Sequence, residues 1–403
     1  MPTTRRPVLT ATARLLALVA VASPVAVRAQ AASGPTGFEV GGLPVAAFDS
    51  DEGFGYGAFA QLYDYGDGEY APYRWSLQPT LYNTSKGRLE AYAFFDAPHL
   101  LPGGWRLNGW VGYERFVATP YYGLGNDAPY DPTLDAEDGP NPYWYRFGRT
   151  RAAARFTLQY GISSTPWRLL LGVGIEDVDV DPLPRDEGTT LFAQEFGAAS
   201  TGYGSSFLRA GLVRDTRDRE TGTRTGSWSE FLVWWSDESL ASHFSAVRWT
   251  LTDRRYCTLA EGLVLAHRMA LQGVDDGAPL PELTRLQTSF QQQEGLGGAK
   301  TVRGVLRNRY TGRGMFVWNS ELRWRAADFA ALGRSFHAVL SAYLDQGRVW
   351  AGGVRADDIF SDLHRGYGGG LRVGMGENFV VAFDGGTSSE TGLQIYLGLG
   401  YLY

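Results

Sequence analysis

The residue types best suited to chemistry are scattered along the chain. Asp177, Asp179 and Asp181 alternate as the first carboxylates of a calcium-binding loop do, but Pro182 and Gly188 stand where that loop needs Gly and Glu. The pattern therefore predicts no EF-hand, and a loose cation site on a surface loop is the alternative that remains. The five histidines show no metal-ligand spacing, so we predict no metal site and no cofactor.

Ester chemistry needs a serine within reach of a histidine. The Gly-x-Ser-x-Gly turn of the α/β hydrolases is absent, and Ser242 and His243 are the only adjacent serine–histidine pair. A lipase that assembles such residues on the outer face of a β-barrel is an open alternative. We nevertheless expect no catalytic residues and predict that the chain is not an enzyme.

The composition narrows the class of protein that must position these residues. Of 403 residues, 52 are Gly and 14% are aromatic, which excludes a disordered chain because so many rings can bury surface. Cys257 is the only cysteine, so an intramolecular disulfide framework is excluded. Proteins that bind nucleic acids usually carry a net positive charge, whereas this chain has a net charge of −6, so we expect no nucleic-acid partner.

The first residues are typical of a secretory signal peptide. Arg5, Arg6 and Arg14 make a basic start, and the apolar run 15–27 that follows is too short to span a bilayer. Small residues around Ala29 offer a cleavage site. We therefore predict a signal peptide over residues 1–29 and a short N-terminal segment over 30–38.

The remainder, 39–403, alternates between apolar and polar residues with a period of two. In 247–252 the odd positions are apolar and the even ones polar, and 393–403 follows the same rule, with Tyr401 and Tyr403 on the apolar face. This period is typical of strands with one apolar face and predicts no helices. About 16 strands can be placed, roughly at 39–48, 53–64, 71–83, 88–97, 105–117, 143–160, 167–178, 203–215, 226–236, 243–255, 258–272, 313–325, 336–350, 364–376, 377–384 and 391–403.

These strands predict an all-β fold, a transmembrane antiparallel β-barrel. The connections alternate between short turns and long loops at 118–142, 179–202 and 273–312, as in bacterial outer-membrane barrels. Lysine, common on soluble sheets, occurs only at Lys86 and Lys300, and aromatic residues gather near strand ends. A secreted β-sandwich or a propeller is the alternative, but no 40–50-residue repeat supports a propeller.

Several short motifs fall in the longest loop and in the strands after it. The series resembles the barrel domain of the BamA/TamA-type family of outer-membrane proteins, also called bacterial surface antigens. The resemblance implies a 16-stranded barrel whose sixth extracellular loop folds into the lumen and carries a Val-Arg-Gly motif. The matching segments are 297–304 (GGAKTVRG), 309–312 (RYTG), 319–323 (NSELR), 343–350 (YLDQGRVW), 122–126 (YGLGN) and 214–218 (RDTRD).

The resemblance also implies which residues hold that loop. Val302, Arg303 and Gly304 match the loop motif, and Glu321 and Asp345 match acidic residues of the inner wall. Strand alternation independently places both carboxylates on the lumen face. A guanidinium between two carboxylates makes charge-assisted hydrogen bonds, so we expect a loop latch. An arginine in a solvated loop without a fixed partner is the alternative.

Two further expectations concern the loop motif and the last strand. The residue after the motif is Val305, where the family usually has an aromatic residue, so one packing contact is expected to differ. Tyr401 and Tyr403 are expected to form the C-terminal strand signal of an outer-membrane barrel.

The resemblance points to a branch of the family that consists of the barrel alone, without periplasmic POTRA domains. It implies a place in the bacterial outer membrane and assistance in insertion or translocation of proteins or lipids. The expected partners are outer-membrane lipids, and unfolded outer-membrane proteins or a separate periplasmic protein. A gated pore for small solutes and a structural surface barrel are the alternatives.

Overall fold

The computed structural model describes residues 35–403 except 50–52, 135–140, 184–187, 291 and 332. The signal peptide predicted over 1–29 lies outside the described residues. Within the described part of the chain, no helix is long and apolar enough to cross a membrane.

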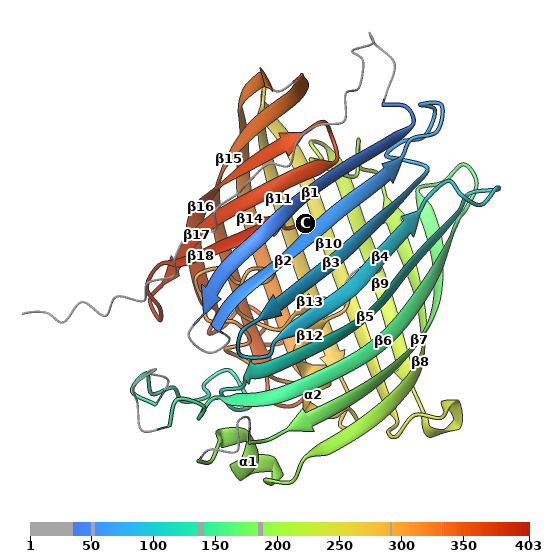
Figure 1. The fold of residues 1–403 in the computed structure, drawn as a ribbon. Coiled ribbons are helices and arrows are strands. Elements are labelled where there is room, and N and C mark those ends of the chain that lie inside the picture. The colour runs from blue at the N-terminus through green and yellow to red at the C-terminus, as the bar shows by residue number, and fades with distance from the viewer. Residues whose placement is uncertain (1–34, 50–52, 135–140, 184–187, 291, 332) are drawn as a thin grey trace, which may run out of the picture.

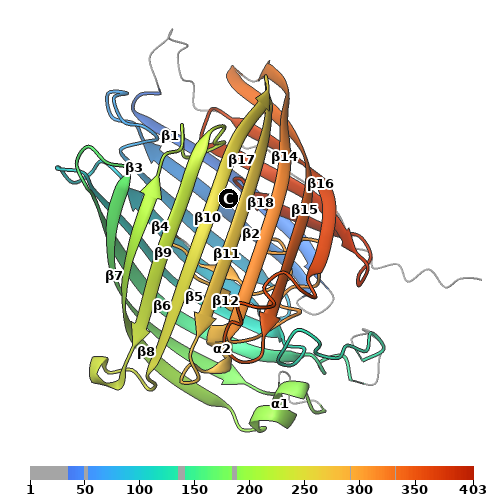
Figure 2. The ribbon, with the colours of Figure 1, turned by 180° about the vertical axis from the view of Figure 1, so that it is seen from behind.

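Sixteen strands form one antiparallel sheet, in which each strand pairs with the next along the chain (Figures 1 and 2). The predicted all-β, 16-stranded architecture is therefore confirmed. The strands are β1 (Phe38–Asp49), β2 (Gly53–Asp64), β3 (Trp75–Thr84), β4 (Leu89–Ala97), β5 (Trp105–Pro120), β6 (Arg146–Gly161), β7 (Trp167–Asp181), β8 (Thr201–Asp215), β9 (Gly226–Ser236), β10 (Ala246–Ala260), β11 (Leu263–Val274), β14 (Gly314–Ala331), β15 (Arg334–Trp350), β16 (His364–Met375), β17 (Phe379–Ser388) and β18 (Gln394–Leu399).

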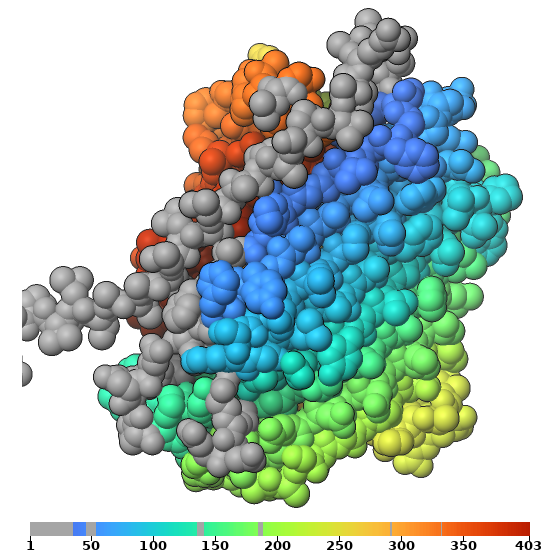
Figure 3. Space-filling view, viewed as in Figure 1, coloured from blue at the N-terminus to red at the C-terminus, as the bar shows by residue number. Residues whose placement is uncertain are grey.

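The alternation of residue types along each strand separates an apolar outside from a polar inside. On β7, Leu171 and Ile175 are 67% and 62% exposed, whereas the next residue, Glu176, is buried on the other face. Such an arrangement inverts the rule for soluble sheets, because the exposed apolar side chains require lipid around them. The outer wall over β1 to β7 is continuous in the space-filling view (Figure 3).

The connections make the two ends of the sheet different. Long loops join β5 to β6, β7 to β8 and β11 to β14 at one end of the sheet, which we call the long-loop end. The opposite end, which includes the tight turn between β10 and β11, is the short-turn end. The long loops carry short helices, α1 (Leu191–Phe196) and α2 (Leu280–Leu283), so the expectation of no helices was wrong. Thr190 caps α1 by accepting a hydrogen bond from the Ala193 amide, a local signal that strand periodicity does not register.

The first and last strands overlap at the edge where the sheet meets itself. In the described residues no ladder of backbone hydrogen bonds joins β1 to β18. Instead, Leu43 on the inner face of β1 packs against Phe379 and Val381 on the outer face of β17 and against Leu399 of β18. A Cβ added at Gly41 would lie 2.6 Å from the Phe379 ring, so β1 needs glycine there to lie this close. We call this overlap the seam.

The chain end does not continue the last strand. β18 stops at Leu399, Gly400 adopts φ +74°, and Tyr403 turns into the lumen. The Tyr403 hydroxyl donates to the Ala266 carbonyl at 2.9 Å, and the Arg268 and Arg323 guanidiniums lie 5.2 and 5.1 Å from its ring. The expectation that Tyr401 and Tyr403 extend the outer apolar face was therefore wrong, because positive φ at Gly400 breaks the two-residue period and inner-wall arginines stabilise the rings.

The connection from β11 to β14 (residues 275–313) passes inside the barrel (Figure 1). It carries α2 and a small hairpin of β12 (Arg285–Leu286) and β13 (Gln293–Glu294). Its apolar side chains form a buried cluster with the inner wall, made of Leu286, Leu296, Val302, Val305 and Tyr310 from the loop and Ala270, Met315, Val317 and Val349 from the strands.

Candidate functional site: a loop anchored inside the barrel

Arg303 lies at the centre of the lumen loop and contacts carboxylates on three strands, β14, β15 and β17. Its Nε and Nη2 donate to the two carboxylate oxygens of Asp345 on β15, at 2.7 and 3.1 Å. Its Nη1 donates to Glu321 on β14 at 2.9 Å and to Asp384 on β17 at 3.4 Å. The structure therefore brings together Arg303, Glu321 and Asp345, the three charged residues that we predicted to hold the loop.

The three side chains are inaccessible to solvent, since Arg303, Glu321 and Asp345 are each 0% exposed. The Arg303 guanidinium also stacks on the Tyr343 ring, 3.4 Å from its centroid. A buried ion pair is costly to desolvate, and removing one partner leaves an uncompensated charge. This geometry can fix the loop to β14 and β15.

Arg372 and Arg323 balance the excess of carboxylates around Arg303. Arg372 pairs with Asp384 and lies 3.5 Å from Glu321, and Arg323 donates to Glu321 at 2.8 Å. Arg323 also contacts the chain end, through the Tyr403 carbonyl. The network therefore links the loop to β17 and to the C-terminal residues beside the seam.

The neighbours of Arg303 in the motif serve the backbone approach and the packing. Gly304 has φ +93°, and a Cβ there would lie 2.5 Å from the Thr387 carbonyl oxygen, so only glycine fits without displacing β17. The Gly304 amide donates to the Tyr396 hydroxyl of β18 at 2.9 Å. Val302 and Val305 are both buried in the loop cluster. Val305, which is smaller than the aromatic residue expected at this position, packs there among mostly aliphatic side chains.

A second buried network, which the sequence did not single out, holds the loop to the opposite wall. Glu282 of α2 accepts a hydrogen bond from Arg248 on β10 at 3.0 Å and one from Tyr203 on β8 at 3.0 Å. Arg285 pairs with Glu282 at 3.0 Å and with Glu176 on β7 at 2.8 Å. Burial alone raises the pKa of a carboxyl, yet Arg285 and Arg248 hold the pKa of Glu282 well below its ordinary range. We call this the second anchor.

The loop tip beyond the second anchor also contacts the wall. The Arg209 side chain donates to the Thr288 carbonyl, and the Ser289 amide donates to Glu230 on β9 at 3.3 Å. The Phe290 ring lies 4.7 Å from the Arg106 guanidinium. The loop is thus tied to both sides of the lumen.

At the short-turn end, the connection from β8 to β9 (residues 216–225) folds toward the lumen. Glu220 accepts two hydrogen bonds from Arg106 of β5, at 2.7 and 2.9 Å. Burial raises the pKa of Glu220, but Arg106 outweighs that effect and lowers the pKa to about 2. Arg217 pairs with Asp215 within the 214–218 motif at 2.9 Å. This turn therefore narrows the lumen at the short-turn end.

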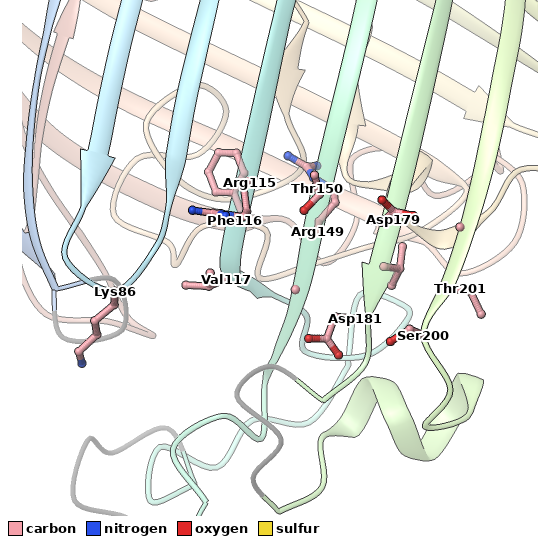
Figure 4. A pocket seen from close by; sticks show the side chains of 13 residues that line it. Lys86, Arg115, Phe116, Val117, Arg149, Thr150, Asp179, Asp181, Ser200 and Thr201 are labelled. Carbon is pink, nitrogen blue, oxygen red and sulfur yellow. The ribbon is translucent and has the colours of Figure 1, made fainter.

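The acidic residues of β7 do not form a metal centre. Asp179 and Asp181 lie on the outer face at the long-loop end, beside an open hollow of about 520 Å³ that Arg115, Thr150 and Lys86 also line (Figure 4). Within the residues described, no three His, Cys, Asp or Glu side chains gather closely enough to hold a metal ion. The mixed charges and the openness of the hollow indicate a solvated surface.

The adjacent pair Ser242 and His243 does not form a nucleophile with a base. The Ser242 hydroxyl contacts Ser236, with Oγ atoms 2.7 Å apart, while His243 Nδ1 accepts from the Gly204 amide at 3.1 Å. Both side chains stabilise the loop between β9 and β10.

Comparisons with known proteins agree with this geometry. The family model described as the Omp85 superfamily domain matches residues 73–392. The fold is similar to that of BamA from Haemophilus ducreyi lacking POTRA domains 1–3, with a TM-score of 0.53 at 12% identity, covering 91% of this chain and 70% of that one. It is also similar to CdiB from Escherichia coli, with a TM-score of 0.54 at 11% identity, covering 94% of this chain and 66% of that one. No curated protein sequence matches significantly.

At such low identities the solved structures support the fold alone, whereas the family model covers most of the chain. The predicted resemblance to BamA/TamA-type barrels is thereby confirmed. The chain is a β-barrel protein that belongs to the Omp85 superfamily.

Proposed function

We propose that this barrel resides in the bacterial outer membrane and assists polypeptides in inserting into, or crossing, that membrane, with the seam as the route. The observation that carries this proposal is the overlap of β1 on β17 and β18, held by apolar side chains such as Leu43 and Phe379. Side-chain contacts of this kind separate at lower cost than a full ladder of backbone hydrogen bonds surrounded by lipid, where each unpaired group costs several kcal/mol.

The seam suits an extended polypeptide. Each edge strand presents backbone N–H and C=O groups that can pair with an added strand. Gly398 on β18 and Pro44 on β1, which has no N–H to donate, weaken the two edges further. Both edges are therefore open to an incoming strand.

In this account the lumen loop braces one side of the seam. Gly304 contacts Tyr396 of β18, and the Thr391 hydroxyl, just before β18, donates to the Gly304 carbonyl. With Arg303 fixed to Asp345, β18 has a rigid support while β1 moves. Outer-membrane lipids and unfolded outer-membrane proteins are the partners that this role requires, and a separate periplasmic protein would deliver the polypeptide.

A gated pore and a structural barrel remain the alternatives. The loop, anchored at Arg303 and Glu282, occupies the lumen, which does not favour free passage of solutes. The test is the folding rate of a small reporter barrel into lipid vesicles that contain this protein. We expect faster reporter folding than in vesicles holding an unrelated 16-stranded porin. Unchanged folding combined with single-channel conductance would instead support a pore.

A further inference from the structure

A cluster of polar side chains interrupts the apolar outer surface of β9, β10, β11 and β14, which lie side by side (Figure 2). The cluster consists of Ser229, Asp253, Arg255, His267 and Ser320. Their neighbours along the strands, such as Arg268 and Glu321, are buried in the lumen, so strand alternation directs the cluster outward.

Exposed apolar side chains flank the cluster on both sides. Toward the short-turn end these are Leu265, Leu322 and Trp324, which are 36%, 42% and 52% exposed, and toward the long-loop end Leu251 is 49% exposed. Ionisable groups facing lipid are costly and are therefore functional candidates by default.

Ser320 and His267 lie directly opposite each other on β14 and β11. His267 Nδ1 and Ser320 Oγ are 2.9 Å apart, and the Trp318 indole N–H points at the same Nδ1 from 3.4 Å. An indole nitrogen only donates, so Nδ1 is the unprotonated acceptor and Nε2 carries the proton. His267 is thus in the tautomer that accepts the Ser320 hydroxyl proton, the arrangement of a nucleophile with its general base.

The neighbouring strand supplies charge of both signs. Arg255 lies opposite His267 in the β10–β11 register, and its side chain is 66% exposed. Asp253 accepts hydrogen bonds from Arg255 Nε at 2.7 Å and from the Ser229 hydroxyl at 2.6 Å. The carboxylate favours a positive charge on His267 when the ring takes up a proton.

We propose that Ser320 and His267 form a catalytic pair that cleaves an acyl ester of a membrane glycerophospholipid. Guanidinium groups bind phosphate, so Arg255 is the site for the lipid phosphate. Strands lie about 4.8 Å apart, which places Ser320 on the second strand from Arg255, roughly 10 Å away. The glycerol esters lie only a few bonds from the phosphate, so a lipid held by its phosphate at Arg255 can present an ester to Ser320 across the same register row. The inference goes beyond the proposed insertion role and does not depend on it.

The reaction balances as an ordinary ester hydrolysis. Ser320 Oγ attacks the ester carbonyl carbon while its proton passes to His267 Nδ1, and that proton then passes to the departing glycerol oxygen, leaving an acyl-serine. Water attacks the acyl-serine with His267 again taking the proton. The fatty acid leaves, and the proton returns to Ser320 Oγ. The products are a lysophospholipid and a fatty acid.

The test uses the full-length barrel in vesicles of phosphatidylethanolamine and phosphatidylglycerol, with fatty-acid release measured by mass spectrometry. We expect release from the wild type, and a loss of about 100-fold or more in Ser320→Ala and His267→Ala. Ser206→Ala, on the outer face of β8, is the matched control and should retain full release. A fluorophosphonate probe should label Ser320, and His267→Ala should abolish that labelling.

Heat-modifiability on gels shows whether each variant has folded, and the probe reports on the wild type without any substitution. Absence of both fatty-acid release and Ser320 labelling in the folded wild type would overturn the proposal. So would release that persists unchanged in folded Ser320→Ala. If the wild type releases no fatty acid but forms a defined oligomer that Arg255→Ala loses, the cluster is a protein interface instead.

Discussion

Replacing Arg303 with alanine tests whether its ion pairs fix the lumen loop to the barrel wall. The substitution removes side-chain hydrogen bonds to Asp345, Glu321 and Asp384. It leaves Glu321 and Asp345, both 0% exposed, without their central counter-charge. Breaking a buried ion pair from one side costs about 3–5 kcal/mol, and we expect Arg303→Ala to be destabilised by this amount.

Arg307→Ala is the matched control within the same loop. Arg307 pairs with Glu294 at 3.6 Å, and the two side chains are 28% and 41% exposed. Exposed pairs contribute about 0–1 kcal/mol, so this variant should stay close to the wild type. The assay is urea unfolding in detergent micelles, followed by tryptophan fluorescence and by the gel shift of the unheated barrel.

Limited proteolysis gives an independent measure of the same contact. Most of the described residues of the loop after Gly277 are buried or half-buried, so this part should resist protease in the wild type and in Arg307→Ala, and be cut in Arg303→Ala. Equal unfolding free energies and equal protease resistance in the two variants would show that the Arg303 ion pairs do not fix the loop.

Three further predictions follow from the same contacts. Gly304→Ala should destabilise the barrel by about 1–3 kcal/mol in urea unfolding, because φ +93° and the 2.5 Å approach to Thr387 strain any side chain there; wild-type stability would contradict this. Glu282→Gln should expose residues 280–294 to protease while the Arg303 contacts persist, since Arg248 and Arg285 lose their shared carboxylate; a protected segment would show that the second anchor is dispensable. The pKa of Glu220 falls from an ordinary value near 4.3 to about 2, so its contribution to the stability of the barrel is complete above about pH 4.3 and is lost as the pH drops toward 2. Glu220→Gln should therefore lose less stability than the wild type over this acid range. An unchanged pH dependence would contradict the Arg106–Glu220 contact.

Strand periodicity made the fold predictable. In a lipid-facing barrel the two-residue alternation is enforced on every strand, so residues such as Glu321 and Asp345 could be placed on the inner wall without coordinates. The lumen position of the loop was predicted only through its resemblance to a family, because no local pattern shows that a polar loop turns inward.

Contacts between distant segments were not predictable in this way. The second anchor joins Glu282, in a short helix, to Arg248 on β10 and, through Arg285, to Glu176 on β7. Only the path of the loop brings these residues together. Likewise, the Ser320–His267 pair depends on the register of β11 against β14, which alternation leaves open by steps of two residues. The inward turn of Tyr403 depends on one positive φ at Gly400.

If polypeptides pass through the seam, covalently closing it should stop the activity. Leu43→Cys and Phe379→Cys, introduced into a Cys257→Ser background, place one thiol on each side of the overlap. Reporter-barrel folding into vesicles is then measured before and after oxidation. We expect the oxidised disulfide form to lose the acceleration of reporter folding, and reduction to restore it. Equal acceleration with the seam covalently closed would show that the polypeptide does not pass through it.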